Sequence, residues 1–336
     1  MRIRKSSFWL ISCGLLLLVV SLFYISIGEY SISINQVIKS IMTPGSSTPD
    51  INMVIRILRL PRLLSSLFVG CALGVSGAIL QSISLNPLAS PGILGINSGA
   101  GLAAVGITIL GASHSFLVML PLFSFLGALI SVSVIYLLTN HFHDSSFKMI
   151  LIGIAISSIT SAGITLCLTF GEIQNAQQAL TWLSGSVYGR KWLHVYILAI
   201  PIIILFIMTL LLAHEADVLS LGNDIAMSVG SSTKLFRSIL LIIAIGLASV
   251  AVSICGPIGF IGLASPHISR KMVGIKHFSL LMMSGLTGAL LVVISDLLGK
   301  IIFSPIEMPV GVITAFIGAP YFIILLTKKR QYNVNS

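Results

Sequence analysis

Residues 63 to 143 contain no aspartate, glutamate, lysine or arginine. A domain folded in water needs charged side chains over its surface, and this stretch cannot supply them. In the whole chain only 8% of residues are charged, 56% are hydrophobic, and the mean hydropathy is +1.07. Because about 20 apolar residues in a helix cross a bilayer, we predict an all-α polytopic membrane protein.

Turn signals divide the apolar sequence into about ten spans. Asn86-Pro87 and Pro91-Gly92 separate two of them, and Gly256-Pro257 splits the uncharged run 238–269. The predicted spans are 8–28, 63–83, 92–111, 115–140, 149–170, 192–213, 238–255, 258–274, 278–299 and 308–327.

The distribution of cations gives the predicted orientation. Ten spans put both termini on one side, and the 19 Lys and Arg divide 12 to 7 in favour of that side, which places both termini in the cytoplasm. The net charge of +10 therefore serves orientation, and no nucleic-acid partner is needed. We expect one transmembrane domain over 1–336 in the cell membrane. Four of the seven external cations lie in its first external segment: Lys39, Arg56, Arg59 and Arg62.

The chain lacks the usual sites for nucleotides and metals. No G-x-x-x-x-G-K-S/T phosphate loop occurs, so any ATP and its Mg belong to another subunit and no cofactor is expected here. His141-x-His143 lies in a predicted cytoplasmic turn and is interpreted as part of a solvated loop, so no metal site is predicted.

Two residues support alternative functions. Asp296 lies deep in the ninth span, where a carboxylate is costly, so it either pairs with a polar group or carries ions in a secondary transporter. Ser76, in Gly74-Val75-Ser76-Gly77, matches a motif of intramembrane serine proteases, with His267 as a conceivable base. Packing explains the same glycines: small residues four apart, such as Gly70 and Gly74, mark close helix faces in lipid. The chain is therefore predicted not to be an enzyme.

The longest polar segment between spans on the cytoplasmic side is 214–237. It reads as short helices, because Ile225, Ala226 and Val229 fall at helical spacing and Gly230 stands where a helix would stop. A helix of this kind outside the membrane has an apolar side to bury, and a partner subunit could cover it.

Several segments resemble the permease subunits of ATP-binding-cassette importers for iron-siderophore complexes, haem and cobalamin. They occur in consistent order from residue 59 to residue 320: RLPR at 59–62, GAILQ at 77–81, NPLASPGILG at 86–95, GPIGFIGL at 256–263 running into Pro266, His267 and Arg270, MPVGV at 308–312 and GAP at 318–320.

The resemblance implies a ten-span subunit that takes up an iron(III)-siderophore or a related iron chelate. It also implies partners: a second permease, two ATP-binding subunits below and an extracytoplasmic binding protein above. Arg59, Arg62 and Lys300 would dock the binding protein, since arginine pairs bidentately with carboxylate. The coupling helix would include Gly222, Asp224, Ala226, Val229 and Gly230. Pathway and gate positions would be Gln81, Asn86, Ser98, Ser145 and Ser146, although capping explains Asn86 equally well.

Overall fold

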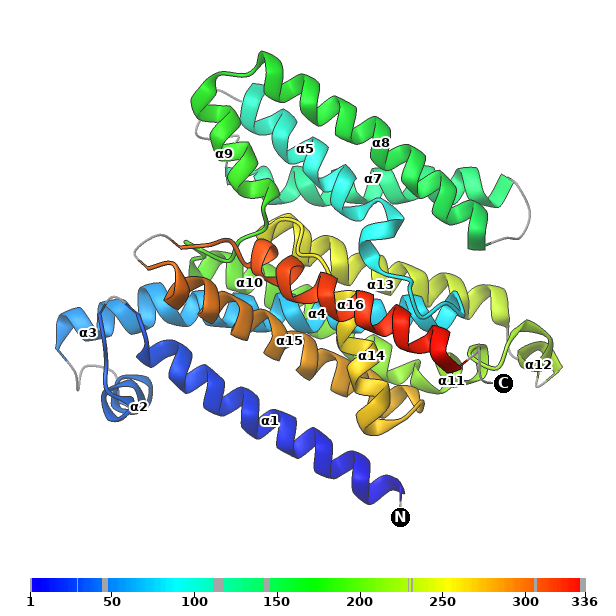
Figure 1. Cartoon of the computed structure of the whole chain (residues 1–336), viewed down its shortest axis with the longest axis horizontal. Helices are drawn as coiled ribbons and strands as arrows, with labels where there is room; N and C mark the ends of the chain where they lie inside the picture. The colour runs from blue at the N-terminus through cyan, green and yellow to red at the C-terminus, as the bar shows by residue number, and fades with distance from the viewer. Residues whose placement is uncertain are drawn as a thin grey trace.

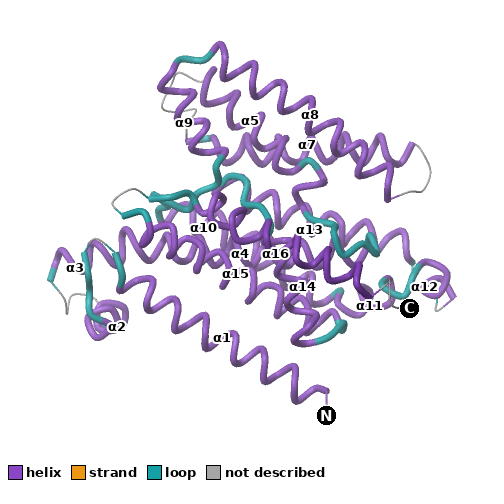
Figure 2. Tube along the Cα trace, in the orientation of Figure 1, coloured by secondary structure: helices purple, strands orange, loops and turns teal. Residues whose placement is uncertain are grey.

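The computed structural model of the chain describes residues 2–28, 30–43, 48–110, 118–141, 146–228, 230, 232–304 and 307–332. Within these residues the fold is helical and has no strand (Figures 1 and 2). Each of the ten predicted spans corresponds to one helix. These helices are α1 (Arg2–Ser26), α4 (Leu60–Ile83), α5 (Ile96–Leu110), α7 (Leu120–His141), α8 (Ser146–Phe170), α10 (Trp192–Leu211), α13 (Thr233–Cys255), α14 (Ile261–Val273), α15 (His277–Ile302) and α16 (Val310–Tyr332). The all-α prediction is confirmed.

Shorter elements connect these helices. They are α2 (Ile34–Met42), α3 (Pro49–Met53), the π-helical turn η1 (Val54–Arg59), the 3-10 turn η2 (Pro91–Leu94), α9 (Ile173–Leu183), α11 (Ala213–Leu219) and α12 (Asn223–Ser228). Helices α2 and α9 lie in segments for which the sequence predicts no span. At η1 the helix widens to π-helical geometry just before Pro61. The nitrogen of Pro61 carries no hydrogen and cannot donate to the carbonyl of Ile57 four residues earlier.

The long helices run back and forth along the longest axis of the molecule (Figure 1). We call the end that carries α11 and α12 the inner end, and the end that carries α2 and α3 the outer end. Helix α1 begins and α16 finishes at the inner end, in agreement with an even number of crossings.

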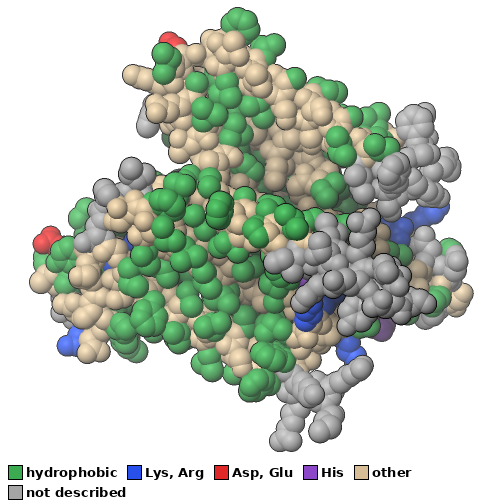
Figure 3. All heavy atoms as spheres, viewed as in Figure 1, with side chains coloured by type: hydrophobic (Ala, Val, Ile, Leu, Met, Phe, Trp, Pro, Cys, Tyr) green, Lys and Arg blue, Asp and Glu red, His purple; other side chains and the backbone are tan. Residues whose placement is uncertain are grey.

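The outer surface of the bundle suits lipid. Large hydrophobic side chains are exposed along α1, including Phe8, Ile11 and Leu15. Hydrophobic atoms also cover much of the face in Figure 3, whereas Lys and Arg appear toward its two ends. In the described residues seven helices are long and apolar enough to cross a membrane, and α5 and α16 contain shorter apolar stretches.

Helices α4 and α15 pack closely against each other. A Cβ atom added at Gly70 would lie 2.4 Å from the carbonyl oxygen of Gly288, and one at Gly74 would lie 2.2 Å from that of Ser284. The small-residue face predicted at Gly70 and Gly74 therefore packs against Ser284 and Gly288 of α15. In lipid such close backbone approach is a main source of helix association.

The break predicted at Gly256-Pro257 is confirmed. Helix α13 ends at Cys255, and α14 begins at Ile261. Gly256 has a φ of 72°, and a Cβ there would lie 2.3 Å from the carbonyl oxygen of Trp182, so only glycine fits this corner.

Candidate functional site

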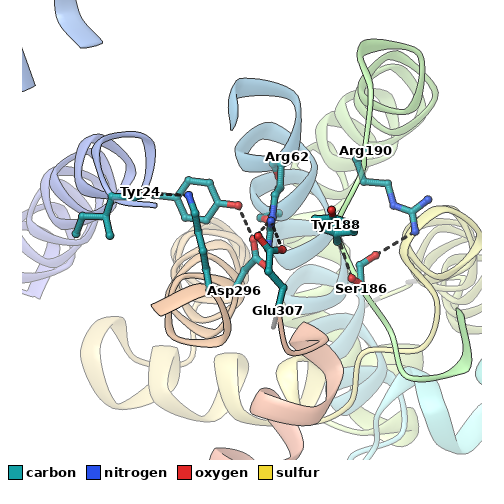
Figure 4. A network of polar contacts seen from close by, with 10 residues as sticks. Tyr24, Arg62, Ser186, Tyr188, Arg190, Asp296 and Glu307 are labelled. Atoms are coloured by element: carbon teal, nitrogen blue, oxygen red, sulfur yellow. Dashed lines mark hydrogen bonds and ion pairs between the residues drawn. The ribbon is translucent and has the colours of Figure 1, made fainter. Parts of the chain in front are cut away.

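An ion-pair cluster joins α4 to α15 at the outer end (Figure 4). The Arg62 guanidinium donates from Nε to Oδ2 of Asp296 at 2.8 Å and from Nη2 to Oδ1 at 2.7 Å, a bidentate pair. Its Nη1 donates to Oε2 of Glu307 at 2.6 Å, in the link before α16. The Asp296 side chain is 2% exposed and the Glu307 side chain 30%. Arg62 thus has one buried acceptor and one acceptor at the rim.

Aromatic rings complete this outer cluster. The Tyr24 hydroxyl donates to Oδ2 of Asp296, and the Tyr188 ring centroid lies 5.4 Å from Cζ of Arg62. The Lys300 ammonium lies 5.3 Å from the Tyr24 ring centroid, within the range of cation–π attraction. Every charge of the cluster therefore has a partner within this chain.

Two cations close the outer end of α1. Arg59 donates to the carbonyl oxygens of Ile25, Ser26 and Tyr30, and Lys300 donates to that of Ile27 at 2.6 Å. The last carbonyl oxygens of a helix have no N–H donor inside the helix and carry partial negative charge, so cations stabilise them. This arrangement accounts for part of the external excess of positive charge.

The three residues predicted to dock the binding protein are thus brought together, but not as a free basic rim. Arg59 is 7% exposed and Arg62 is 8% exposed, because partners within the chain surround both side chains. The buried partner of Arg62 is Asp296, which is distant in the sequence. The partners of Arg59 are backbone carbonyl oxygens. The docking role itself stays a prediction.

Asp296 has the paired environment that the sequence analysis offered as one of two interpretations. Both of its oxygens accept from Arg62, and one also accepts from Tyr24. Ser76 is fully buried, and its hydroxyl donates to the carbonyl oxygen of Ala244 at 2.6 Å, while the His267 ring packs edge-on against Tyr321. These contacts support neither the ion-coupled transporter nor the protease.

A second polar cluster lies at the inner end of the same helix pair. Gln81 accepts from Nη1 of Arg270 at 2.5 Å and donates toward the carbonyls of Gly262 and Leu263. Beside it, the Ser82 hydroxyl lies 2.6 Å from Nε2 of His277, the first residue of α15. Gln81 is therefore buried and links α4 to α14, and its pathway role stays a prediction.

The short helix predicted between Gly222 and Gly230 is present as α12, and α11 precedes it. Gly222 and Gly230, with φ of 98° and 81°, flank α12, so both glycines take a left-handed conformation. Ala226 is fully buried, whereas Ile225 is 53% exposed and Met227 56%. Asp224 lies in the first turn of α12, and Val229 lies outside the described residues.

The remaining pathway predictions fall in several places. The Asn86 side chain accepts from the backbone N–H of Leu88 at 2.9 Å, a contact within the turn that follows α4. The Ser98 hydroxyl lies 3.3 Å from that of Ser157 on α8. Ser145 and His143 lie outside the described residues, and Ser146 is the first residue of α8.

Helix α8 carries a hydroxyl stripe that the sequence analysis missed. Ser158, Ser161, Thr165 and Thr169 are exposed and recur every three or four residues, so they share one face. A hollow of about 590 Å³ lies over this face and is lined by Ile93, Gly153, Ile154, Ser157, Ser158 and Ser161. The period of hydroxyl residues was visible in the sequence and could have revealed the stripe.

The comparisons with known proteins identify this architecture. Residues 16–328 match the FecCD transport family. The chain belongs to this family. It is 43% identical to the Fe(3+) dicitrate transport system permease protein FecD of Escherichia coli over 87% of this chain and 91% of that protein. It is 36% identical to the iron(3+)-hydroxamate import system permease protein FhuG of Bacillus subtilis over 93% and 95% of the two chains.

A solved structure agrees with these relatives. An inward-facing protein described as a metal-chelate type ABC transporter superposes with a TM-score of 0.84 at 30% identity, covering 95% of this chain and 98% of that one. The FecCD-family chain is accordingly an ABC transporter permease that spans the cell membrane several times.

Proposed function

We propose that this permease carries an iron(III) chelate, most directly a ferric siderophore, into the cytoplasm. The observation that carries the proposal is the hydroxyl stripe on α8, a face of a membrane-length helix that this chain does not cover. Residues 151–170 contain no charged side chain. Hydroxyls such as those of Ser158 and Thr165 already donate to carbonyls of their own helix. Such a wall offers weak polar contacts and lets an oxygen-rich chelate pass without trapping it.

The names of the relatives favour the same class of cargo, because Fe(3+) dicitrate and iron(3+)-hydroxamate are both oxygen-ligated ferric chelates. A second permease, either an identical copy or a sibling, would face the α8 stripe and close the pathway. Separate ATP-binding subunits would supply the energy and bind ATP and Mg.

The coupling site is proposed at α12. The apolar side chains of Ile225 and Met227 are exposed on α12 at the inner end, and an ATP-binding subunit would bury them. Ala226 and the flanking Gly222 and Gly230 set the shape of this short helix.

The extracytoplasmic binding protein is proposed to dock around Arg59, Arg62 and Lys300. Of these, Lys300 gives the cleanest test, because Arg62→Glu would bring three carboxylates together and disturb folding. We expect Lys300→Gln to weaken association with the binding protein while leaving the assembly with ATP-binding subunits intact. Unchanged association in Lys300→Gln would remove Lys300 from the docking surface.

The transport proposal is tested by reconstitution of the permease with its ATP-binding subunits and binding protein in vesicles. Uptake of a ⁵⁵Fe-labelled siderophore should require ATP and should persist when the proton gradient is collapsed. Uptake by vesicles that lack the ATP-binding subunits would contradict it. So would loss of uptake when only the proton gradient is collapsed and ATP is still present.

The pathway proposal is tested separately by thiol labelling in a cysteine-free variant of the chain. Ser161→Cys should react with a membrane-impermeant thiol reagent in the assembled transporter. Ile159→Cys, at an apolar position of α8 that is 67% exposed, is the matched control and should stay unlabelled in lipid. Equal labelling of the two would place the aqueous path elsewhere.

A further inference from the structure

In the inner cluster, three hydrogen-bonded residues link the segment 214–237 to the helix bundle. Oδ1 of Asp217 lies 2.7 Å from Nδ1 of His277 and accepts the backbone N–H of the same residue at 2.8 Å. On the other side of the ring, Nε2 lies 2.6 Å from the Ser82 hydroxyl, which in turn donates to the carbonyl of Ala78. One imidazole therefore joins α11, α15 and α4.

The carboxylate of Asp217 stabilises α15 in a second way. His277 is the first residue of α15, and the first N–H groups of a helix have no acceptor inside it. Asp217 supplies that acceptor from another helix and places negative charge at the positive end of the α15 dipole. Movement of α11 away from this position would therefore cost α15 both a hydrogen bond and a favourable charge.

Burial changes sharply across this chain of contacts. The His277 side chain is 3% exposed, whereas that of Asp217 is 40% exposed. Ala213, Ala216 and Leu219 of α11 are buried, and their apolar side chains make contacts without direction. The contacts of Asp217 with His277 add directional hydrogen bonds to this junction.

Beyond His277, α4 and α15 are held together along their length. The backbones of α4 and α15 touch at Gly70 and Gly288, and the Arg62–Asp296 pair fastens the same two helices at their outer ends. A displacement applied at Ser82 and His277 is therefore delivered to both helices as one body.

We propose that His277 is a positioning residue for transport, through which movement of α11 and α12 is passed to the α4–α15 pair. This inference rests on the proposed function, in which an ATP-binding subunit moves α12. When α12 moves with α11, Asp217 pulls on the imidazole and on the start of α15, and Ser82 carries the same movement into α4.

The experiment measures chelate transported per ATP hydrolysed by the complete reconstituted transporter. In His277→Phe, which keeps a ring of similar size and removes its hydrogen bonds, we expect this ratio to fall about tenfold while ATP hydrolysis and subunit assembly persist. His277→Gln, which retains one donor and one acceptor, should recover part of the ratio.

The matched control is Thr287→Val. It removes a buried hydrogen bond of 3.0 Å between Thr287 and Ser269, which ties α15 to α14 without touching α11. This variant should keep the wild-type ratio. An equal fall in Thr287→Val would mean that any buried hydrogen bond of α15 matters, and it would overturn the specific role of His277.

If His277→Phe does not fold, Asp217→Ala provides the test. The Asp217 side chain is half exposed, so its truncation disturbs the fold less. Its ratio should fall in the same way, and a wild-type ratio in this assembled variant would refute the inference. Failure of the wild-type complex itself to couple ATP to uptake would instead refute the proposed function, so the two outcomes are distinct.

Discussion

The two ends of the α4–α15 pair solve different problems with similar residue types. At the outer end, Arg62, Asp296 and Glu307 satisfy one another, and the neighbouring cations satisfy the end of α1. At the inner end, His277 reaches through Asp217 to a segment outside the bundle. The outer cluster closes the structure upon itself, whereas the inner cluster connects the bundle to α11. Similar buried polar groups therefore satisfy one another at one end of the helix pair and hold a separate short helix at the other.

The largest expected effect comes from breaking the outer cluster. Asp296→Ala leaves the Arg62 guanidinium buried without its bidentate acceptor, and we expect a loss of about 3–5 kcal/mol in the free energy of unfolding. Denaturant unfolding of the purified protein in detergent micelles measures this loss. The double variant Asp296→Leu with Arg62→Met removes both charges and should recover much of it. A stable single variant would show that the pair is dispensable.

At the inner end, Ala226→Pro should act on coupling rather than on the bundle. The backbone N–H of Ala226 donates to the carbonyl of Gly222 at 3.0 Å, and proline removes this bond at a local cost of about 3 kcal/mol. We expect loss of coupled uptake with little change in the unfolding of the bundle. The comparison fails if Ala226→Pro lowers the stability as much as Asp296→Ala does.

The helix contact between the two clusters provides a sharper test of stiffness. Gly70→Ala forces a Cβ against the backbone of α15 and should destabilise the protein by about 2 kcal/mol, as overpacking does. Gly106→Ala, where a Cβ has open space within 4 Å, is the control and should be neutral or slightly stabilising. Thermal unfolding of both variants measures the difference, and equal melting temperatures would argue against close α4–α15 packing.

The smallest effect is expected at the rim of the outer cluster. Glu307→Gln removes a charge that is partly exposed to solvent and should cost no more than about 1 kcal/mol of stability. High salt should change the stability of this variant less than that of the wild type. A loss as large as that in Asp296→Ala would show that the rim and the buried acceptor contribute equally.

The fold was predictable to the extent that local sequence determines it. Apolar length and breakers such as Gly256-Pro257 gave the spans, because a helix in lipid must satisfy its own backbone. The spacing of Gly70 and Gly74 gave a packing face for the same local reason. The short helices 34–42 and 173–183 were not predicted, because neither has the length or apolarity of a span.

The sites were less predictable because they depend on which helices become neighbours. Arg62 and Asp296 are 234 residues apart, and nothing in the sequence states that α4 and α15 are adjacent. For this reason Arg62 could be identified as an unusual external cation but not as half of an internal pair. The His277 contacts have the same origin, since Ser82 and Asp217 come from two other helices. The α8 stripe is different: its period was present in the sequence.

The uncovered face of α8 has a consequence for how chelate preference would evolve. In the proposed pathway one polypeptide supplies only one wall, so the fit between pathway and chelate would depend on two permease subunits. Where the second subunit is the product of a sibling gene, the preferred chelate could change by substitutions in one subunit while the other still accepts the old chelate.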